Sequence, residues 1–177
     1  LIIEKEAFFR NPVRVTDRSE VRPALNQAQR HIIEEVTADY RAGRPGVHLV
    51  HGVTGSGKTE VYLGIIEEMI AMGKQAIMLI PEIALTYQTL LRFYKRFGNR
   101  VSVINSSLSA GEKYDQIERA KAGEIDVMIG PRSALFTPFA NLGVIVVDEE
   151  HENSYKSETS PRYHARETAV KIASLCG

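Results

Sequence analysis

Short apolar runs alternate with amphipathic segments along most of the chain. The runs lie near residues 47–53, 75–80, 101–105, 125–130 and 143–148. The last run holds an unbroken β-branched stretch, Val144–Val147, which is typical of a strand buried on both faces of a parallel sheet. Before, between and after the runs, apolar residues recur at helical spacing in five segments. This alternation predicts an α/β fold, a mostly parallel sheet with helices on both faces.

Glycines mark the ends of the helical segments. A glycine just after a periodic stretch can adopt the left-handed conformation that ends a helix. Four glycines fill such positions: Gly43, Gly73, Gly98 and Gly123. Ser109 and Glu112 have the spacing of a capping box, which predicts that a helix begins there. Helix boundaries are therefore indicated by local sequence alone.

The chain is expected to form one domain preceded by a linker. Residues 1–23 mix charges with Pro12 and Pro23 and show only a short strand-like alternation, so we expect a linker or an incoming edge segment there. The domain itself is expected over residues 24–177, a length that suits a single hydrophobic core. Because the chain begins with Leu1 rather than Met, we interpret it as part of a longer protein.

The segment GVTGSGKT matches the pattern G-x-x-x-x-G-K-[ST] of a P-loop. Glycines in such a loop let the backbone bend so that successive N–H groups point at phosphate oxygens. Lys58 would reach the β and γ phosphates, and the Thr59 hydroxyl would bind Mg²⁺. The expected nucleotide-binding residues of this segment are Gly52, Thr54, Gly55, Ser56, Gly57, Lys58 and Thr59.

The surrounding sequence favours a P-loop over an ordinary glycine-rich turn. His48, Leu49 and Val50 predict a strand before the segment, and a helical pattern starts directly after it. The phosphates would then lie at a helix N-terminus, where unpaired N–H groups and the helix dipole favour anions.

The acidic motif DEEH, Asp148–His151, follows the last apolar run. Ligands of parallel α/β sheets bind at the carboxyl ends of the strands, so these acids are expected beside the P-loop. Asp148 is the candidate partner of Mg²⁺, and Glu149 is the candidate base that orients the attacking water. With the P-loop, they predict binding and hydrolysis of a nucleoside triphosphate. The alternative is a solvated charge run after a strand.

Gln29 is the candidate contact with the nucleotide base. It lies on the same face of a predicted helix as Ile33 and Val36, ahead of the P-loop. Its amide could bond the adenine edge as both donor and acceptor. A polar residue near the start of a helix is an equally weighted alternative.

Three segments are candidates for contact with nucleic acid. PEIALT at residues 81–86 could present backbone N–H groups and hydroxyls to a nucleic-acid backbone. GPRSALF could present Arg132 and Ser133 to a nucleic-acid backbone, although an arginine that ties two loops together is the alternative for Arg132. After the acidic motif, aromatic residues are interleaved with cations, as in sites that stack single-stranded bases. The candidates there are Tyr155, Lys156, Arg162, Tyr163 and His164. A surface loop with incidental tyrosines is the alternative for this segment.

Composition narrows the classes of protein further. With 22 basic and 22 acidic residues, the chain has no overall attraction to nucleic acid, so any contact must be local. The single cysteine, Cys176, excludes internal disulfides and a cysteine-rich zinc site within these residues. No apolar stretch approaches the ~20 residues of a membrane span, and the first residues do not resemble a signal peptide. We therefore expect a soluble intracellular protein.

In this order and spacing, GVTGSGKTEVYL, PEIALT, GPRSALF, DEEH and SYK with PRYHAR resemble the bacterial primosomal replication-restart helicases of superfamily 2. The likeness covers about residues 24–175. It implies a RecA-like P-loop NTPase lobe, the first of two motor lobes, that uses ATP and Mg²⁺ and moves 3′ to 5′ on DNA. It also implies that His151 relays the nucleotide state and that residues 152–166 sense single-stranded DNA. Some members carry Trp in that loop, whereas this chain has none.

The resemblance further implies the surroundings of this lobe. Single-stranded and forked DNA, the single-stranded-DNA-binding protein and other primosome proteins would be its partners, in the bacterial cytoplasm near the nucleoid and without membrane contact. The family's zinc module, second motor lobe and arginine finger would lie outside these residues. Because an arginine finger contributes ~10³ to 10⁵ in turnover, the lobe alone is expected to bind ATP weakly and to hydrolyse it barely.

Three other functions are weighed against a helicase lobe. A P-loop small-molecule kinase would need an arginine-bearing lid near its carboxyl end and would have no use for DEEH. A duplex DNA translocase of the restriction or recombination type is disfavoured by PRYHAR. A non-catalytic platform that only docks primosome proteins is the third alternative.

Overall fold

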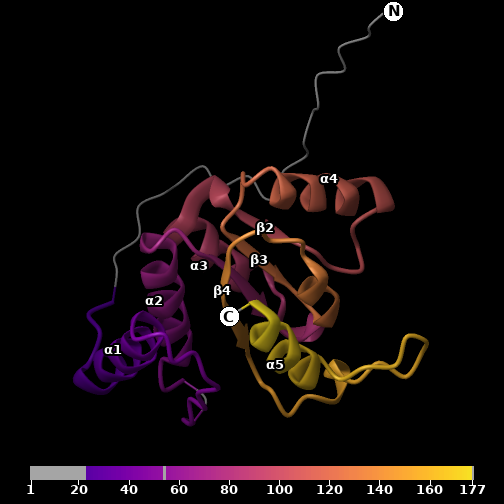
Figure 1. Ribbon diagram of the computed structural model, residues 1–177. Helices are drawn as coiled ribbons and strands as arrows, with labels where there is room; N and C mark the ends of the chain where they lie inside the picture. The colour runs from indigo at the N-terminus through magenta and orange to yellow at the C-terminus, as the bar shows by residue number, and fades with distance from the viewer. Residues whose placement is uncertain (1–22, 54, 177) are drawn as a thin grey trace, which may run out of the picture.

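The computed structural model describes residues 23–53 and 55–176, which form a sheet flanked by helices (Figure 1). The linker expected over residues 1–23 therefore lies outside the described residues, apart from Pro23.

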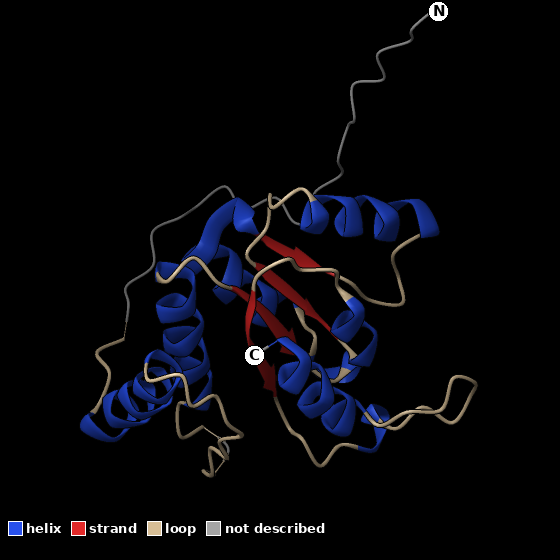
Figure 2. Ribbon diagram, in the orientation of Figure 1, coloured by secondary structure: helices blue, strands red, loops and turns tan. Residues whose placement is uncertain are grey.

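The core of the fold is a four-stranded parallel sheet (Figure 2). Its strands lie in the order β2-β3-β1-β4, and each neighbouring pair is parallel. The strands are β1 (Gln75–Leu79), β2 (Val101–Val103), β3 (Val127–Gly130) and β4 (Leu142–Val147). Four of the five expected strands and the parallel arrangement are thereby confirmed.

Five helices confirm the helical segments expected from the sequence. They are α1 (Gln27–Arg41), α2 (Lys58–Ala71), α3 (Tyr87–Phe97), α4 (Ala110–Lys121) and α5 (Ala165–Cys176). Helices α2 and α3 pack on one face of the sheet, α4 and α5 pack on the other, and α1 packs on α2. None of the described helices is long and apolar enough to cross a bilayer.

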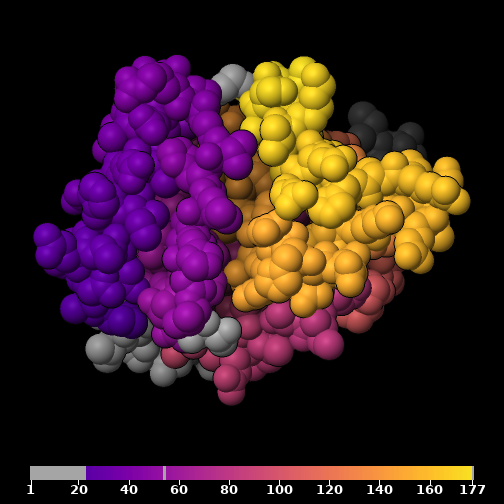
Figure 3. All heavy atoms as spheres, turned by 90° about the horizontal axis from the view of Figure 1, so that it is seen from below, coloured from indigo at the N-terminus to yellow at the C-terminus, as the bar shows by residue number. Residues whose placement is uncertain are grey.

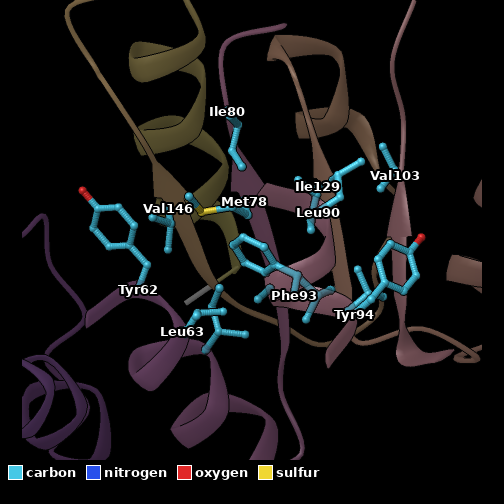
Figure 4. Packing of buried hydrophobic residues seen from close by; sticks show 14 residues of the cluster. Tyr62, Leu63, Met78, Ile80, Leu90, Phe93, Tyr94, Val103, Ile129 and Val146 are labelled. Atoms are coloured by element: carbon cyan, nitrogen blue, oxygen red, sulfur yellow. The ribbon is translucent and has the colours of Figure 1, made fainter. Parts of the chain in front are cut away.

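Strand β1 contributes to the core on both faces of the sheet. Ala76 and Met78 join the cluster under α2 and α3, whereas Ile77 and Leu79 join the cluster under α4 and α5. This is the two-residue alternation of a strand, and all four side chains are at most 1% exposed. Figure 4 shows the first cluster, where Phe93 from α3 lies close to Met78.

The prediction of a strand over residues 47–53 is wrong. These described residues belong to no strand, and Val47, Leu49 and Val53 are 78–79% exposed. A strand needs a hydrogen-bonding partner as well as an apolar pattern. The edge strand β4 pairs only with β1 among the described residues, so the segment before the P-loop runs as a loop.

The predicted helix ends are confirmed. All four glycines expected to follow helices have positive φ angles, between 63° and 73°. Ser109 and Glu112 form the predicted capping box, in which each side chain accepts a hydrogen bond from the other residue's backbone N–H.

The parallel arrangement brings the carboxyl ends of the strands to one edge of the sheet. Figure 3 views the molecule from that side and shows the N-terminal segments in indigo and purple facing the C-terminal segments in orange and yellow. The P-loop and the acidic motif therefore approach each other although about 90 residues separate them in the sequence.

Gly130, the last residue of β3, lies against the backbone that follows β2. A Cβ atom at Gly130 would lie 2.3 Å from the carbonyl oxygen of Ile104, a contact that requires the backbone to shift. We therefore expect Gly130→Ala to lower the free energy of unfolding by about 1–3 kcal/mol, measured by urea denaturation. Gly111→Ala is the matched control, because nothing lies within 4 Å of its Cβ position in α4. Equal losses in both variants would contradict the explanation.

Candidate functional site

The P-loop ends at the first turn of α2, as predicted. Gly57 is the N-cap residue of α2 and has a φ angle of 84°, and Gly55 has a φ angle of 80°, so both adopt conformations that favour glycine. A Cβ atom at Gly52 would lie 2.7 Å from the Ser56 hydroxyl oxygen. The glycines thus allow the tight bend. Thr54, another expected contact, lies outside the described residues.

Lys58 folds back over the bend. Its Nζ donates hydrogen bonds to the carbonyl oxygens of Gly52 (2.7 Å) and Val53 (3.2 Å). The ammonium group therefore lies inside the curve of the P-loop, where a lysine of this motif is expected to meet phosphate.

Gln29 connects α1 to the P-loop. Its side-chain oxygen accepts from the backbone N–H of Asn26, which completes a capping box, and its Nε2 donates to the carbonyl oxygen of Gly57 at 3.2 Å. The helix-start alternative therefore accounts for one half of the amide, and the other half contacts the P-loop. A contact with adenine stays a prediction.

Asp148 is held at both of its backbone groups. Its N–H donates to the carbonyl oxygen of Leu79, which continues the pairing of β4 with β1, and its carbonyl oxygen accepts from the Tyr155 hydroxyl at 2.7 Å. The next residue, Glu149, has a φ angle of 46°, which is uncommon for a residue with a side chain. Its N–H donates to Asp148 Oδ1 at 3.1 Å, and this local hydrogen bond accompanies the turn.

The electrostatic surroundings of Asp148 favour its neutral form. Burial and the neighbouring Glu149 raise the pKa of the Asp148 carboxyl, and the Glu149 N–H, Lys58 and the Tyr62 hydroxyl offset this only in part. Burial, and then the charges of Asp148 and Glu149, raise the pKa of Tyr62 to about 12, so this phenol stays protonated and donates to Asp148. A bound cation would relieve the repulsion between these carboxylates.

One pocket of about 340 Å³ brings the two motifs together. It is lined by Gly55, Gly57, Lys58, Thr59, Glu60, Arg92, Asp148 and Glu149. The predicted phosphate-binding lysine, both predicted Mg²⁺ residues and the predicted base therefore share one cavity. The volume is at the lower end of the range for ligand pockets.

The pocket also contains residues that sequence reasoning missed. Glu60 follows Thr59 directly, and Arg92 comes from α3, whose sequence contains no recognised nucleotide motif. Tyr62, in the helical segment after the P-loop, was not singled out from the sequence, yet its hydroxyl is close enough to Asp148 for each group to affect the other's pKa. The one available signal was its spacing, because a residue three positions after Thr59 lies on the same side of the helix.

His151 lies beside the candidate base but outside the pocket lining. Its Nε2 is 3.7 Å from a Glu149 carboxylate oxygen, and its side chain is 70% exposed. The distance would allow an ion pair if the imidazole is protonated, and its role as a relay stays a prediction.

The structure sorts the expected nucleic-acid residues into two groups. Arg132 donates through one guanidinium nitrogen to the carbonyl oxygens of Ser154 (2.7 Å) and Lys156 (2.9 Å), so it ties two loops together as the alternative proposed. Tyr155 lies between these two residues and is 1% exposed. The expectation that Tyr155 stacks on a base is therefore corrected, because its ring is part of the core.

The other expected residues lie at or near the surface. Tyr163 is half-buried and meets Phe136 edge to face, with the ring centroids 5.3 Å apart. Phe136 is 56% exposed and was not singled out from the sequence. His164 pairs with Lys156 through an isolated antiparallel bridge. Among the remaining candidates, the exposed ones are Ser133, Lys156 and Arg162.

Comparison with known proteins provides a family for this arrangement. A family model described as DEAD/DEAH box helicase matches residues 26–174. The replication restart protein PriA of Bacillus subtilis is 48% identical over 170 residues, which cover 95% of this chain and 21% of that protein.

Other relatives have the same name. The replication restart protein PriA of Synechocystis sp. is 44% identical over 176 residues, with 97% of this chain and 20% of that protein covered. The replication restart protein PriA of Haemophilus influenzae is 51% identical over 127 residues, which cover 72% of this chain and 17% of that protein. The chain thus spans about a fifth of the length of these relatives.

The raised pKa of Asp148 predicts a pH-dependent cost to stability. Because the folded carboxyl binds its proton more tightly than the unfolded one, the free energy of unfolding falls as pH rises from the unfolded pKa through the folded one. Asp148→Asn removes this loss. We expect the variant to gain stability relative to the parent chain as pH rises from 3 to 7 without metal, measured by denaturant titration at each pH.

Asp115→Asn in α4 makes the same chemical change away from the pocket and is the control. A relative stability of the Asp148→Asn variant that stays constant or falls with pH would show that burial does not disfavour the Asp148 charge.

The burial of Tyr155 predicts a loss of folding rather than a selective loss of binding. Removing a buried aromatic side chain costs about 3–5 kcal/mol, so Tyr155→Ala should lower the free energy of unfolding by that amount. Tyr155→Phe removes only the hydrogen bond to Asp148 and should cost about 1 kcal/mol. Tyr163→Ala, at a half-buried position, should cost less than Tyr155→Ala in the same denaturation experiment. A reversed order would place Tyr155 outside the core.

Proposed function

This chain belongs to the DEAD/DEAH box helicase family, and we propose that it is the ATP-binding motor lobe of a 3′ to 5′ DNA helicase that reloads the replication machinery at stalled or repaired forks. The names of the relatives support the proposed action at replication forks, since several are replication restart proteins. In this proposal, ATP hydrolysis is coupled to the binding of single-stranded DNA.

The shared pocket is the observation that carries the proposal. Lys58 and Thr59 reach it from the start of α2, whereas Asp148 and Glu149 reach it from the end of β4. Hydrolysis of a triphosphate needs donors for the phosphates, a carboxylate for Mg²⁺ and a group that orients water. All three kinds of group line this one cavity.

The residues present fit a nucleotide and Mg²⁺. The bend requires glycine at position 57, because a Cβ atom there would lie 2.3 Å from Gln29 Nε2. Thr59 and Asp148 offer oxygen ligands, which Mg²⁺ prefers. No group of three or more His, Cys, Asp or Glu side chains suited to a metal occurs among the described residues. Mg²⁺ would therefore complete its coordination with phosphate oxygens and water, and when bound it would neutralise phosphate charge.

Each side chain of the pocket then has a distinct role. The N–H groups of the bend and of the first turn of α2 bind phosphate oxygens, and Lys58 exchanges its bonds to backbone carbonyls for bonds to phosphate. Tyr62 holds the Asp148 carboxylate in place. Glu149, next along the chain, orients the water that attacks the terminal phosphorus, and Gln29 selects adenine.

Single-stranded DNA would bind beside the segment that follows the acidic motif. Phe136 and Tyr163 supply aromatic surface there, and Lys156 and Arg162 are exposed cations in the same segment or next to it. Stacked bases and neutralised phosphates are the two contacts that such sites use. Arg132 contributes by fixing the carbonyl groups around Tyr155.

The remaining partners follow from the same proposal. Forked DNA, the single-stranded-DNA-binding protein and other primosome proteins would meet this lobe in the bacterial cytoplasm, where replication forks are restarted. The zinc module, the second motor lobe and its arginine finger would be supplied from outside the described residues.

The proposed role of Glu149 predicts a separation of binding from hydrolysis. In a full-length protein that carries this lobe, Glu149→Gln should leave the affinity for ATP within about twofold, because the amide keeps the size and polarity of the side chain. It should lower DNA-stimulated phosphate release by about 10²-fold or more, because an amide cannot accept the proton of the water. Steady-state phosphate release with and without single-stranded DNA measures both rates.

Two control variants are measured in the same assay. Lys58→Ala should lose ATP affinity as well, and Glu158→Gln makes the same change at an exposed position outside the pocket. Normal turnover of Glu149→Gln would exclude Glu149 as the base. A parent protein whose phosphate release does not respond to DNA would favour a small-molecule kinase over a helicase.

A further inference from the structure

Arg92 is the one lining residue of the pocket that belongs to neither recognised motif nor their flanks. It comes from the middle of α3, which packs beside α2 on the same face of the sheet. Its side chain is exposed, and it makes no hydrogen bond or ion pair with the rest of the described chain. An arginine without a protein partner on a pocket wall requires an explanation.

The neighbouring charges do not provide a partner for Arg92. Glu60, a lining carboxylate in the first turn of α2, is paired with Arg96, which lies one helical turn after Arg92 in α3. Arg96 is 7% exposed and also donates to Glu67 at 2.8 Å. Asp148 accepts from Tyr62. The third lining carboxylate, Glu149, lies 3.7 Å from His151, and no ion pair joins Arg92 to any of the three among the described residues.

The two lining cations also differ in their surroundings. Lys58 is bonded to backbone carbonyls of the bend, whereas Arg92 has no such contact in the described structure. A guanidinium group carries its charge at all physiological pH values and presents a planar fork that matches two phosphate oxygens at once. Arg92 thus has the chemistry and the position of a second phosphate ligand beside Lys58.

Resting on the proposed function, we infer that Arg92 binds the terminal phosphate of ATP and makes the pocket prefer ATP to ADP. The N–H groups of the bend and of α2 are suited to the inner phosphates, since these groups lie at the helix N-terminus. Arg92 instead shares the pocket with Glu149, the candidate for orienting water at the terminal phosphorus. Helix α3 then reports on the nucleotide state through this single contact.

The test compares nucleotide affinities in a full-length protein that carries this lobe. The variants are Arg92→Ala, Arg92→Lys and, as a control that removes a cation from the same helix outside the pocket, Lys95→Ala. Affinities for a non-hydrolysable ATP analogue and for ADP are measured by fluorescence competition. Melting temperatures without nucleotide show whether each variant folds normally.

We expect Arg92→Ala to bind the ATP analogue about tenfold more weakly or worse, because a hydrogen bond to a charged group contributes about 1.5–3 kcal/mol and 1.4 kcal/mol is a factor of ten. ADP affinity and the melting temperature should stay unchanged, and Lys95→Ala should match the parent protein. Arg92→Lys should recover part of the loss, since it keeps the charge but not the fork.

Three outcomes would overturn the inference. They are unchanged affinity for both nucleotides, an equal loss for ATP and ADP, and a loss of DNA affinity with nucleotide affinity unchanged. Lys58→Ala, measured in parallel, separates this failure from failure of the proposed function. If the affinity for the ATP analogue falls in Lys58→Ala but not in Arg92→Ala, only the inference about Arg92 fails. If neither loses nucleotide, the ATP site itself is misassigned.

Discussion

The site depends on the fixed backbone of Asp148. Its N–H bonds the carbonyl oxygen of Leu79, and its own carbonyl oxygen accepts from the buried Tyr155 hydroxyl. With both backbone groups held, the side chain can project in only a few directions, and it lines the pocket. The chain must then turn sharply at Glu149, which accounts for its positive φ angle. The second acidic side chain reaches the pocket because the first is anchored.

Helices and inner strands of this fold are predictable because their signals are local. The glycines that follow α1, α2, α3 and α4, the Ser109 capping box and the β-branched stretch before Asp148 all act within a few residues. The exposed segment 47–53 has an equally apolar pattern, but pairing in a sheet is a non-local property that no short pattern specifies. The segment forms no strand because it lacks a pairing partner, which its own sequence cannot specify.

The candidate site also contains residues that local sequence predicts and residues that only tertiary packing brings in. The P-loop and the acidic motif are recognisable because their chemistry requires particular residues at fixed spacing. Arg92 lies 34 positions after Lys58 in the sequence, so only tertiary packing brings the two to one cavity. Tyr155 and Tyr163 occupy an irregular segment without periodicity, and nothing in their sequence distinguishes the buried ring from the half-buried one. The structure assigns the first to the core and the second to an aromatic pair with Phe136.

The arginine tie has a mechanical consequence. Arg132 donates hydrogen bonds to the main chain on either side of Tyr155, and the Tyr155 hydroxyl donates to the carbonyl oxygen of Asp148, directly after β4. These three residues form a short rigid link between the outer surface and the acidic rim. A ligand that displaces the backbone of Ser154 or Lys156 must pull the phenol with it, and the phenol is bonded to the main chain of Asp148. A displacement at the surface would therefore act on the main chain of Asp148, which is also bonded to Leu79 at the end of β1.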